Sequence, residues 1–116
     1  MPKPVHFEIT ARAPRKAAAF YGKVFGWAVA ESPYLPGYFT LGEAGEGGAV
    51  MDRQHIDQPV IVWFGVDALE TVLQSITASG GRQVNEINTI PGVGRVVYAA
   101  DPDGVVFGLR EAVRAS

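Results

Sequence analysis

Two side chains near the start of the chain have types and a spacing that suit acid–base chemistry. His6 and Glu8 are two residues apart in the alternating segment VHFEIT, and alternate residues of a β-strand point to the same face of a sheet. An imidazole supported by a carboxylate can act as a general base. The alternative is structural: His6 is satisfied by hydrogen bonds, and Glu8 forms an ion pair with Arg95 or Arg110. For His6 the sequence favours the structural interpretation, and for Glu8 it leaves both open.

A second group of side chains suits the binding of a small molecule. Trp63 is the best candidate for a surface on which an aromatic ring stacks, because alternation along residues 59–66 places it on the face away from the following helix. Trp27 and Phe39 can join it, although aromatic residues of short strands more often belong to the core. The candidate ligand-binding residues are Thr10, Tyr38, Trp63 and Arg110.

The composition excludes several kinds of chemistry. The chain has no cysteine, which excludes disulfides, thiolate catalysis and cysteine-based metal sites. Its 10 basic and 12 acidic side chains give a net charge of -2, so it lacks the electrostatic signature of a nucleic-acid partner. No segment approaches the roughly 20 apolar residues of a membrane span, and the N-terminus lacks the apolar run of a secretory signal. We expect a soluble, cytoplasmic protein without a membrane partner.

The elements that position these residues come as two copies of one order. Residues 4–10 predict a strand, and residues 14–25 predict a helix that ends at Gly26. Residues 59–66 and 68–79 repeat this order, with Gly80 after the second helix. The remaining predicted strands are residues 27–31, 38–41, 48–52, 82–86, 93–100 and 105–111.

Apolar spacing predicts which face of each helix is buried. The first helix is expected to bury Ala17, Phe20, Tyr21, Val24 and Phe25, and the second to bury Leu69, Val72, Leu73 and Ile76. Asp67 is expected as the N-cap of the second helix, with Glu70 completing a capping box. The strands are expected to turn Val5, Phe7, Ile9, Val62, Phe64 and Val66 toward the helices.

These patterns predict an α+β fold of two βαβββ modules, about residues 4–52 and 59–111, within a single domain of residues 1–116. A curved mixed sheet of eight strands would surround a ligand cup, with the helices on its outer face. The polar stretch 53–58 is too short to separate independent domains. A dimeric ferredoxin-like α/β barrel is the alternative, but it would need fewer strands after each helix.

Two segments carry a resemblance to a known family. HFEITARAPRKAAAFYGKVFGW and the ending ADPDGVVFGLRE resemble the vicinal oxygen chelate superfamily, the group of glyoxalases, bleomycin resistance proteins and extradiol dioxygenases. The resemblance covers nearly the whole chain and implies the fold predicted above. It also implies a homodimer, to which an exposed sheet edge is suited.

The resemblance also implies where a metal ion would be bound. Metal-bearing members hold a divalent ion with one His, Glu or Gln from each of four strands, and His6 matches the first of these positions. The second falls near Asp52, in an alignment that the sequence leaves uncertain. The third falls at Ile61 and the fourth at Gly108, neither of which can bind a metal. We therefore expect no cofactor and no metal site.

Three functions remain open. The first is metal-free binding of a small, partly aromatic molecule, as the bleomycin-resistance branch of the family implies. The second is a metal-dependent glyoxalase or dioxygenase, which the residues at the ligand positions oppose. The third is metal-free catalysis by His6 and Glu8, in an isomerase or lyase that acts on a carbonyl compound. The first is the one that the sequence favours.

Overall fold

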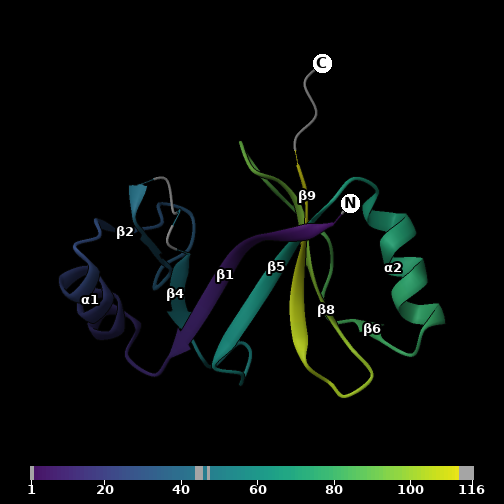
Figure 1. Ribbon diagram of the computed structural model, residues 1–116, viewed down its shortest axis with the longest axis horizontal. Coiled ribbons are helices and arrows are strands. Elements are labelled where there is room, and N and C mark those ends of the chain that lie inside the picture. The colour runs from purple at the N-terminus through teal and green to yellow at the C-terminus, as the bar shows by residue number, and fades with distance from the viewer. Residues whose placement is uncertain (1, 44–45, 47, 113–116) are drawn as a thin grey trace. The chain divides into compact units, whose positions relative to one another are not determined.

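The computed structural model describes residues 2–43, 46 and 48–112, and Figure 1 shows its ribbon. The chain divides into two compact units. The N-terminal unit is His6–Ile61, and the C-terminal unit consists of Met1–Val5 and Val62–Ser116. No helix among the described residues is both long enough and apolar enough to span a membrane. That the two modules form one domain stays a prediction.

The N-terminal unit has the predicted βαβββ order (Figure 1). Its sheet has the strand order β2-β3-β4-β1, in which β4 is parallel to β1 and the other neighbours are antiparallel. The strand β1 starts in the residues assigned to the other unit. The elements are β1 (Lys3–Ala11), α1 (Pro14–Phe25), β2 (Val29–Glu31), β3 (Phe39–Leu41) and β4 (Ala49–Asp52).

The C-terminal unit repeats this order with one strand more. Its sheet has the order β5-β9-β8-β6, with β7 also paired to β8. Strand β5 is parallel to β9, whereas β8 is antiparallel to its neighbours. The elements are β5 (Val60–Val66), α2 (Leu69–Ala78), β6 (Arg82–Gln83), β7 (Asn88–Ile90), β8 (Gly94–Ala100) and β9 (Val106–Ala112).

The structure confirms the α+β class, both helices and each of the eight predicted strands. Strand β7 was not predicted. Its three residues, Asn88–Ile90, have no alternating pattern of their own and are held by pairing with β8. On β5, Phe64 and Val66 pack with α2 as expected, but Val62 is exposed. Ile9 of β1 packs with the core beneath α1, as predicted.

The buried face of α1 differs from the prediction. Ala18 is fully buried, and Ala17 and Tyr21 pack against the same core. Phe20 and Phe25, however, are 60% and 58% exposed, and Val24 is also exposed. Small residues face the sheet because the helix lies close to it, which apolar spacing alone does not show.

Gly22 marks how closely α1 approaches the next strand. A Cβ atom at Gly22 would lie 2.7 Å from Cγ2 of Val29 and 3.1 Å from the carbonyl oxygen of Trp27. A larger residue there would push β2 away from the helix. Gly26 ends α1 in the left-handed conformation, with a φ of 71°, as its position predicted.

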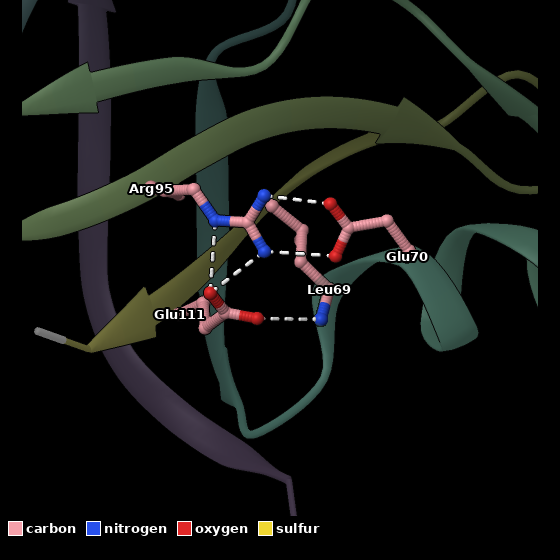
Figure 2. Close-up of polar contacts among 4 residues, drawn as sticks. All are labelled: Leu69, Glu70, Arg95 and Glu111. Atoms are coloured by element: carbon pink, nitrogen blue, oxygen red, sulfur yellow. Dashed lines mark hydrogen bonds and ion pairs between the residues drawn. The ribbon is translucent and has the colours of Figure 1, made fainter. Parts of the chain in front are cut away.

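The start of α2 also differs from the prediction. The N-cap is Ala68, not Asp67, and no side chain of the cap residue forms a capping hydrogen bond. Instead, Oε2 of Glu111 on β9 accepts a hydrogen bond of 2.8 Å from the N–H of Leu69 (Figure 2). A carboxylate from a distant strand therefore satisfies a backbone donor of the first turn.

Arg95 joins this carboxylate to the helix (Figure 2). Its guanidinium donates two hydrogen bonds to Glu70, of 2.6 and 2.8 Å, and one of 2.9 Å to Glu111. Glu70 therefore pairs with β8 and does not complete a capping box. The expected alternative in which Arg95 pairs with Glu8 is not what forms, since the carboxylates on Arg95 are Glu70 and Glu111.

The same contacts hold both carboxyl groups in the ionised form. Hydrogen bonds from Arg95 lower the pKa of Glu70 from 4.5 to about 2. The backbone N–H of Leu69, followed by Arg95, lowers the pKa of Glu111. A carboxyl group whose pKa is lower in the folded state stabilises the fold above its ordinary pKa, and this contribution is lost as the pH falls toward the folded value.

Arg95→Met should therefore make the free energy of unfolding depend less on pH in the acid range. The difference in urea midpoint between the wild type and the variant should be greatest above about pH 5 and should shrink between about pH 5 and pH 2. Arg82→Met, at the exposed strand β6, is the control and should show no such trend. A difference for Arg95→Met that is constant with pH would contradict this assignment.

Candidate functional site

The structure brings together two of the predicted site residues, His6 and Tyr38. Nε2 of His6 lies 3.0 Å from the hydroxyl oxygen of Tyr38, and both side chains are half-buried. The main chain around Tyr38 is fixed by two hydrogen bonds: Ser32 N–H to the Tyr38 carbonyl at 2.8 Å, and Tyr38 N–H to the Leu35 carbonyl at 3.2 Å. The phenol is thus held beside the imidazole, and either group can donate the hydrogen bond that joins them.

Glu8 and Thr10 follow His6 on the same face of β1. Glu8 is only 3% exposed, and Thr10 only 1%. The hydroxyl of Thr10 donates to the Gln58 carbonyl at 2.6 Å and accepts a 3.1 Å hydrogen bond from Nε of Arg53. Thr10 therefore ties the end of β1 to the segment after β4. These contacts give its hydroxyl a structural role.

The pairing of β1 with β4 settles which face of the sheet Asp52 occupies. Glu8 is in register with Ala49, and Ala11 with Asp52. Residues in register share a face, so Asp52 lies on the α1 side, opposite to His6. Its Oδ1 accepts a 2.7 Å hydrogen bond from the Gln54 N–H. The alignment of Asp52 with the second metal-ligand position is therefore wrong.

The C-terminal unit places two aromatic rings on either side of a glycine. Gly108 of β9 is in register with Trp63 of β5 and with Tyr98 of β8. The two rings are 4.9 Å apart between centroids and inclined by 56°. A Cβ atom at Gly108 would overlap the indole of Trp63. The indole therefore lies across the space that a side chain at 108 would need.

Arg110 lies on the same face as this aromatic row. It is two residues beyond Gly108 on β9 and in register with Gly65 and Val96. The opposite face carries Val66, Val97 and Leu109, which pack with α2. Trp63 and Arg110, both predicted to bind a ligand, therefore occupy adjacent rows of one sheet face. Trp27 and Phe39, in contrast, pack in the core of the N-terminal unit.

The residue types at the four positions assigned to metal ligands do not fit a divalent ion. His6 is the only one of the four with a nitrogen or oxygen donor in its side chain, since Ala49 and Met51 share its face on β4, and Ile61 and Gly108 stand at the other two positions. A catalytic metal needs about three protein ligands. Among residues 2–43, 46 and 48–112, no group of three or more His, Asp or Glu side chains could hold a metal ion.

Two shallow hollows of about 400 and 440 Å³ lie on the surface of the N-terminal unit. The first is lined by Arg12, Asp52, Arg53, Gln54 and Asp57, and the second by residues that include Arg15, Glu31 and Phe39. Neither contains any of the candidate catalytic or ligand-binding residues, although the first includes Asp52 and the second Phe39. The ligand cup of the prediction is not one of these hollows.

Comparison with known proteins identifies the family. The family model of the glyoxalase/bleomycin resistance protein/dioxygenase superfamily matches residues 3–109. The chain belongs to this superfamily. The resemblance found in the sequence is therefore confirmed, while the activity within the superfamily stays open.

Three relatives show the range of proteins with this fold. The anthracycline biosynthesis protein DnrV of Streptomyces peucetius is 26% identical over 91% of this chain, which spans only 46% of the relative. The structure of methylmalonyl-CoA epimerase from Mycobacterium tuberculosis is 17% identical, with a TM-score of 0.66 over 96% of this chain and 88% of that one. The Mn(II)-bound glyoxalase from Novosphingobium aromaticivorans is 15% identical, with a TM-score of 0.69 over 98% and 42%.

Tyr98 and the contact between Trp63 and Gly108 were missed by the sequence reasoning. Alternation along residues 93–100 places Tyr98 opposite to the core residue Val97 and so could have indicated its face. That Trp63 lies over Gly108 depends on the register of two strands far apart in sequence, for which the sequence has no local signal.

Gly108→Ala should destabilise the protein by about 1–3 kcal/mol, because the added methyl group overlaps a buried indole. Trp63→Ala should remove the overlap. The double variant should therefore be less destabilised than the sum of the two single variants, as measured by urea denaturation. Strict additivity would contradict the packing described here.

Proposed function

We propose that the protein binds a small, partly aromatic molecule without the help of a metal ion. The observation that carries this proposal is the filling of the last metal-ligand position: Gly108 has no side chain, and the Trp63 indole lies over it. An apolar ring thus stands where a metal-dependent member would need a coordinating group. Ile61, together with Ala49 and Met51 on β4, supports the same conclusion, because none of these side chains has a nitrogen or oxygen donor.

A curated relative supports the aromatic nature of the ligand. DnrV is described as an anthracycline biosynthesis protein, and anthracyclines contain a planar anthraquinone ring system. The identity is 26%, and the match covers less than half of the relative's length. It therefore suggests which class of small molecule to test for binding, and it does not identify a substrate. Aromatic side chains such as Trp63 and Tyr98 suit flat rings of this kind.

Each unit by itself offers half-buried polar side chains from the predicted set: His6 and Tyr38 in the N-terminal unit, and Arg110 in the C-terminal unit. The imidazole and the phenol can each donate or accept a hydrogen bond. Thr10 is a weaker candidate, since its hydroxyl is held by Gln58 and Arg53. The cytoplasmic location and the homodimer stay predictions of the sequence.

Titration with a hydroxyanthraquinone should show saturable binding by calorimetry, and its affinity should not change by more than about twofold when EDTA is added. Trp63→Ala should weaken binding by about tenfold or more, because the indole that supports the Tyr98 ring is lost. Trp27→Phe, in the core of the other unit, is the matched control. Binding that is abolished by EDTA and restored by a divalent ion would overturn the proposal.

A second function is supported by the contact between His6 and Tyr38. A metal-free isomerase or lyase would use His6 as a base that acts on a carbonyl compound, with Glu8 beside it on the same strand face. One protein of the same fold is described as an epimerase, although this likeness shows the fold alone.

For this second function, His6→Ala should abolish turnover while ligand binding remains within about tenfold of the wild type. His55→Ala, at an exposed position outside the strands, is the matched control. Equal activity of His6→Ala and the wild type would exclude His6 as a catalytic base.

A further inference from the structure

The face of the C-terminal sheet that carries Trp63 differs in charge from the face that carries α2. On the α2 face, Arg95 is neutralised by two carboxylates, Glu70 and Glu111. On the other face, Arg110 has no ion-pair partner among the residues that the structure describes. The two arginines are in neighbouring strands, yet within the described part of the chain only Arg95 has its charge balanced.

Arg110 is half-buried, and its neighbours in register offer it nothing acidic. Gly65 has no side chain, and Val96 is apolar. Partial removal of a guanidinium from water is unfavourable unless an opposite charge or hydrogen-bond acceptors replace the lost solvent. A planar guanidinium matches a carboxylate or a comparable anion through two parallel hydrogen bonds.

The row beside Arg110 is aromatic. Trp63 is only 7% exposed, so its indole supports the row but offers little surface to a ligand. Tyr98 is half-buried and lies against the indole, so of the two aromatic residues it is the one that is more exposed. Residues two apart along a strand are separated by about 7 Å, which sets the spacing between the aromatic row and the arginine.

Arg82 is the other arginine on this face, and it is a weaker candidate than Arg110 for binding an anion. Arg82 is in register with Ala100 of β8, and so lies on the same face, one row beyond Tyr98 on the side away from Arg110. Its side chain is exposed at strand β6. An exposed charge keeps its water and contributes little to binding.

We infer that the ligand is an aromatic anion: a flat ring that contacts Tyr98, carrying a carboxylate or similar group about 7 Å away that Arg110 binds. This inference rests on the proposed function and narrows its ligand class. It assigns Tyr98 as a ring-contacting residue and Arg110 as the residue that selects for negative charge.

The test compares 2-naphthoate with 2-naphthamide, which has the same ring system but no charge. Calorimetry should give a dissociation constant for 2-naphthoate at least about tenfold lower than for 2-naphthamide. Arg110→Gln should reduce this ratio to within about twofold, whereas Arg110→Lys should keep part of it. Arg82→Gln, the same substitution on the same face, should change the ratio by less than about twofold.

The contribution of the ring is tested separately. Tyr98→Leu should weaken both probes by a similar factor, about tenfold, and Tyr98→Phe should weaken neither by more than about twofold. Thermal denaturation monitored by circular dichroism establishes that each variant is folded. The Trp27→Phe background leaves Trp63 as the single tryptophan, so saturable quenching there reports binding near the aromatic row.

A ratio that is the same in Arg110→Gln and in the wild type would overturn the inference. If both probes bind equally while a hydroxyanthraquinone still binds, the proposed function stands and the anionic ligand is wrong. If neither the naphthyl probes nor the anthraquinone binds, both proposals fail.

Discussion

The absence of a side chain at residue 108 is the constraint on which the C-terminal unit depends. Strands β5, β9 and β8 bring Trp63, Gly108 and Tyr98 into one row, and only a residue without Cβ leaves room for the indole to cross the middle strand. The same glycine occupies the position to which the resemblance to the family assigns the fourth metal ligand. One residue thus both permits the aromatic row and excludes a coordinating group.

The way α2 is attached makes the two faces of this sheet differ in charge. Glu111 accepts a hydrogen bond from the first helical N–H, and Arg95 joins Glu111 to Glu70. Charged groups on the helix side are therefore used to hold the helix in place. On the other side Arg110 forms no ion pair with any residue that the structure describes, which is why its charge is assigned to the ligand.

The sequence predicted the elements better than the contacts between them. Proline and glycine punctuation placed α1 at Pro14–Phe25 without error, because the helix ends depend on local backbone preferences. The buried face of α1 was misplaced, because Ala18 and Gly22 face the sheet for reasons of distance and not of hydrophobicity. Local patterns do not carry such information.

In the candidate site, too, features set by local sequence were predicted correctly and contacts between distant residues were not. Alternation correctly placed Trp63 and Phe64 on opposite faces of β5, since it depends on a single strand. The N-cap of α2 was misassigned, because the donor of its first turn is satisfied by Glu111, 42 residues away. The contact of His6 with Tyr38 spans 32 residues and likewise had no local signal.

The most direct test of the central claim is elemental analysis of the protein purified without a chelator. Since Gly108 and Ile61 offer no side-chain donor atoms, we expect far less than one equivalent of zinc, iron, manganese or nickel per chain, and no difference between the wild type and His6→Ala. One equivalent of any of these metals in the wild type, lost in His6→Ala, would contradict it.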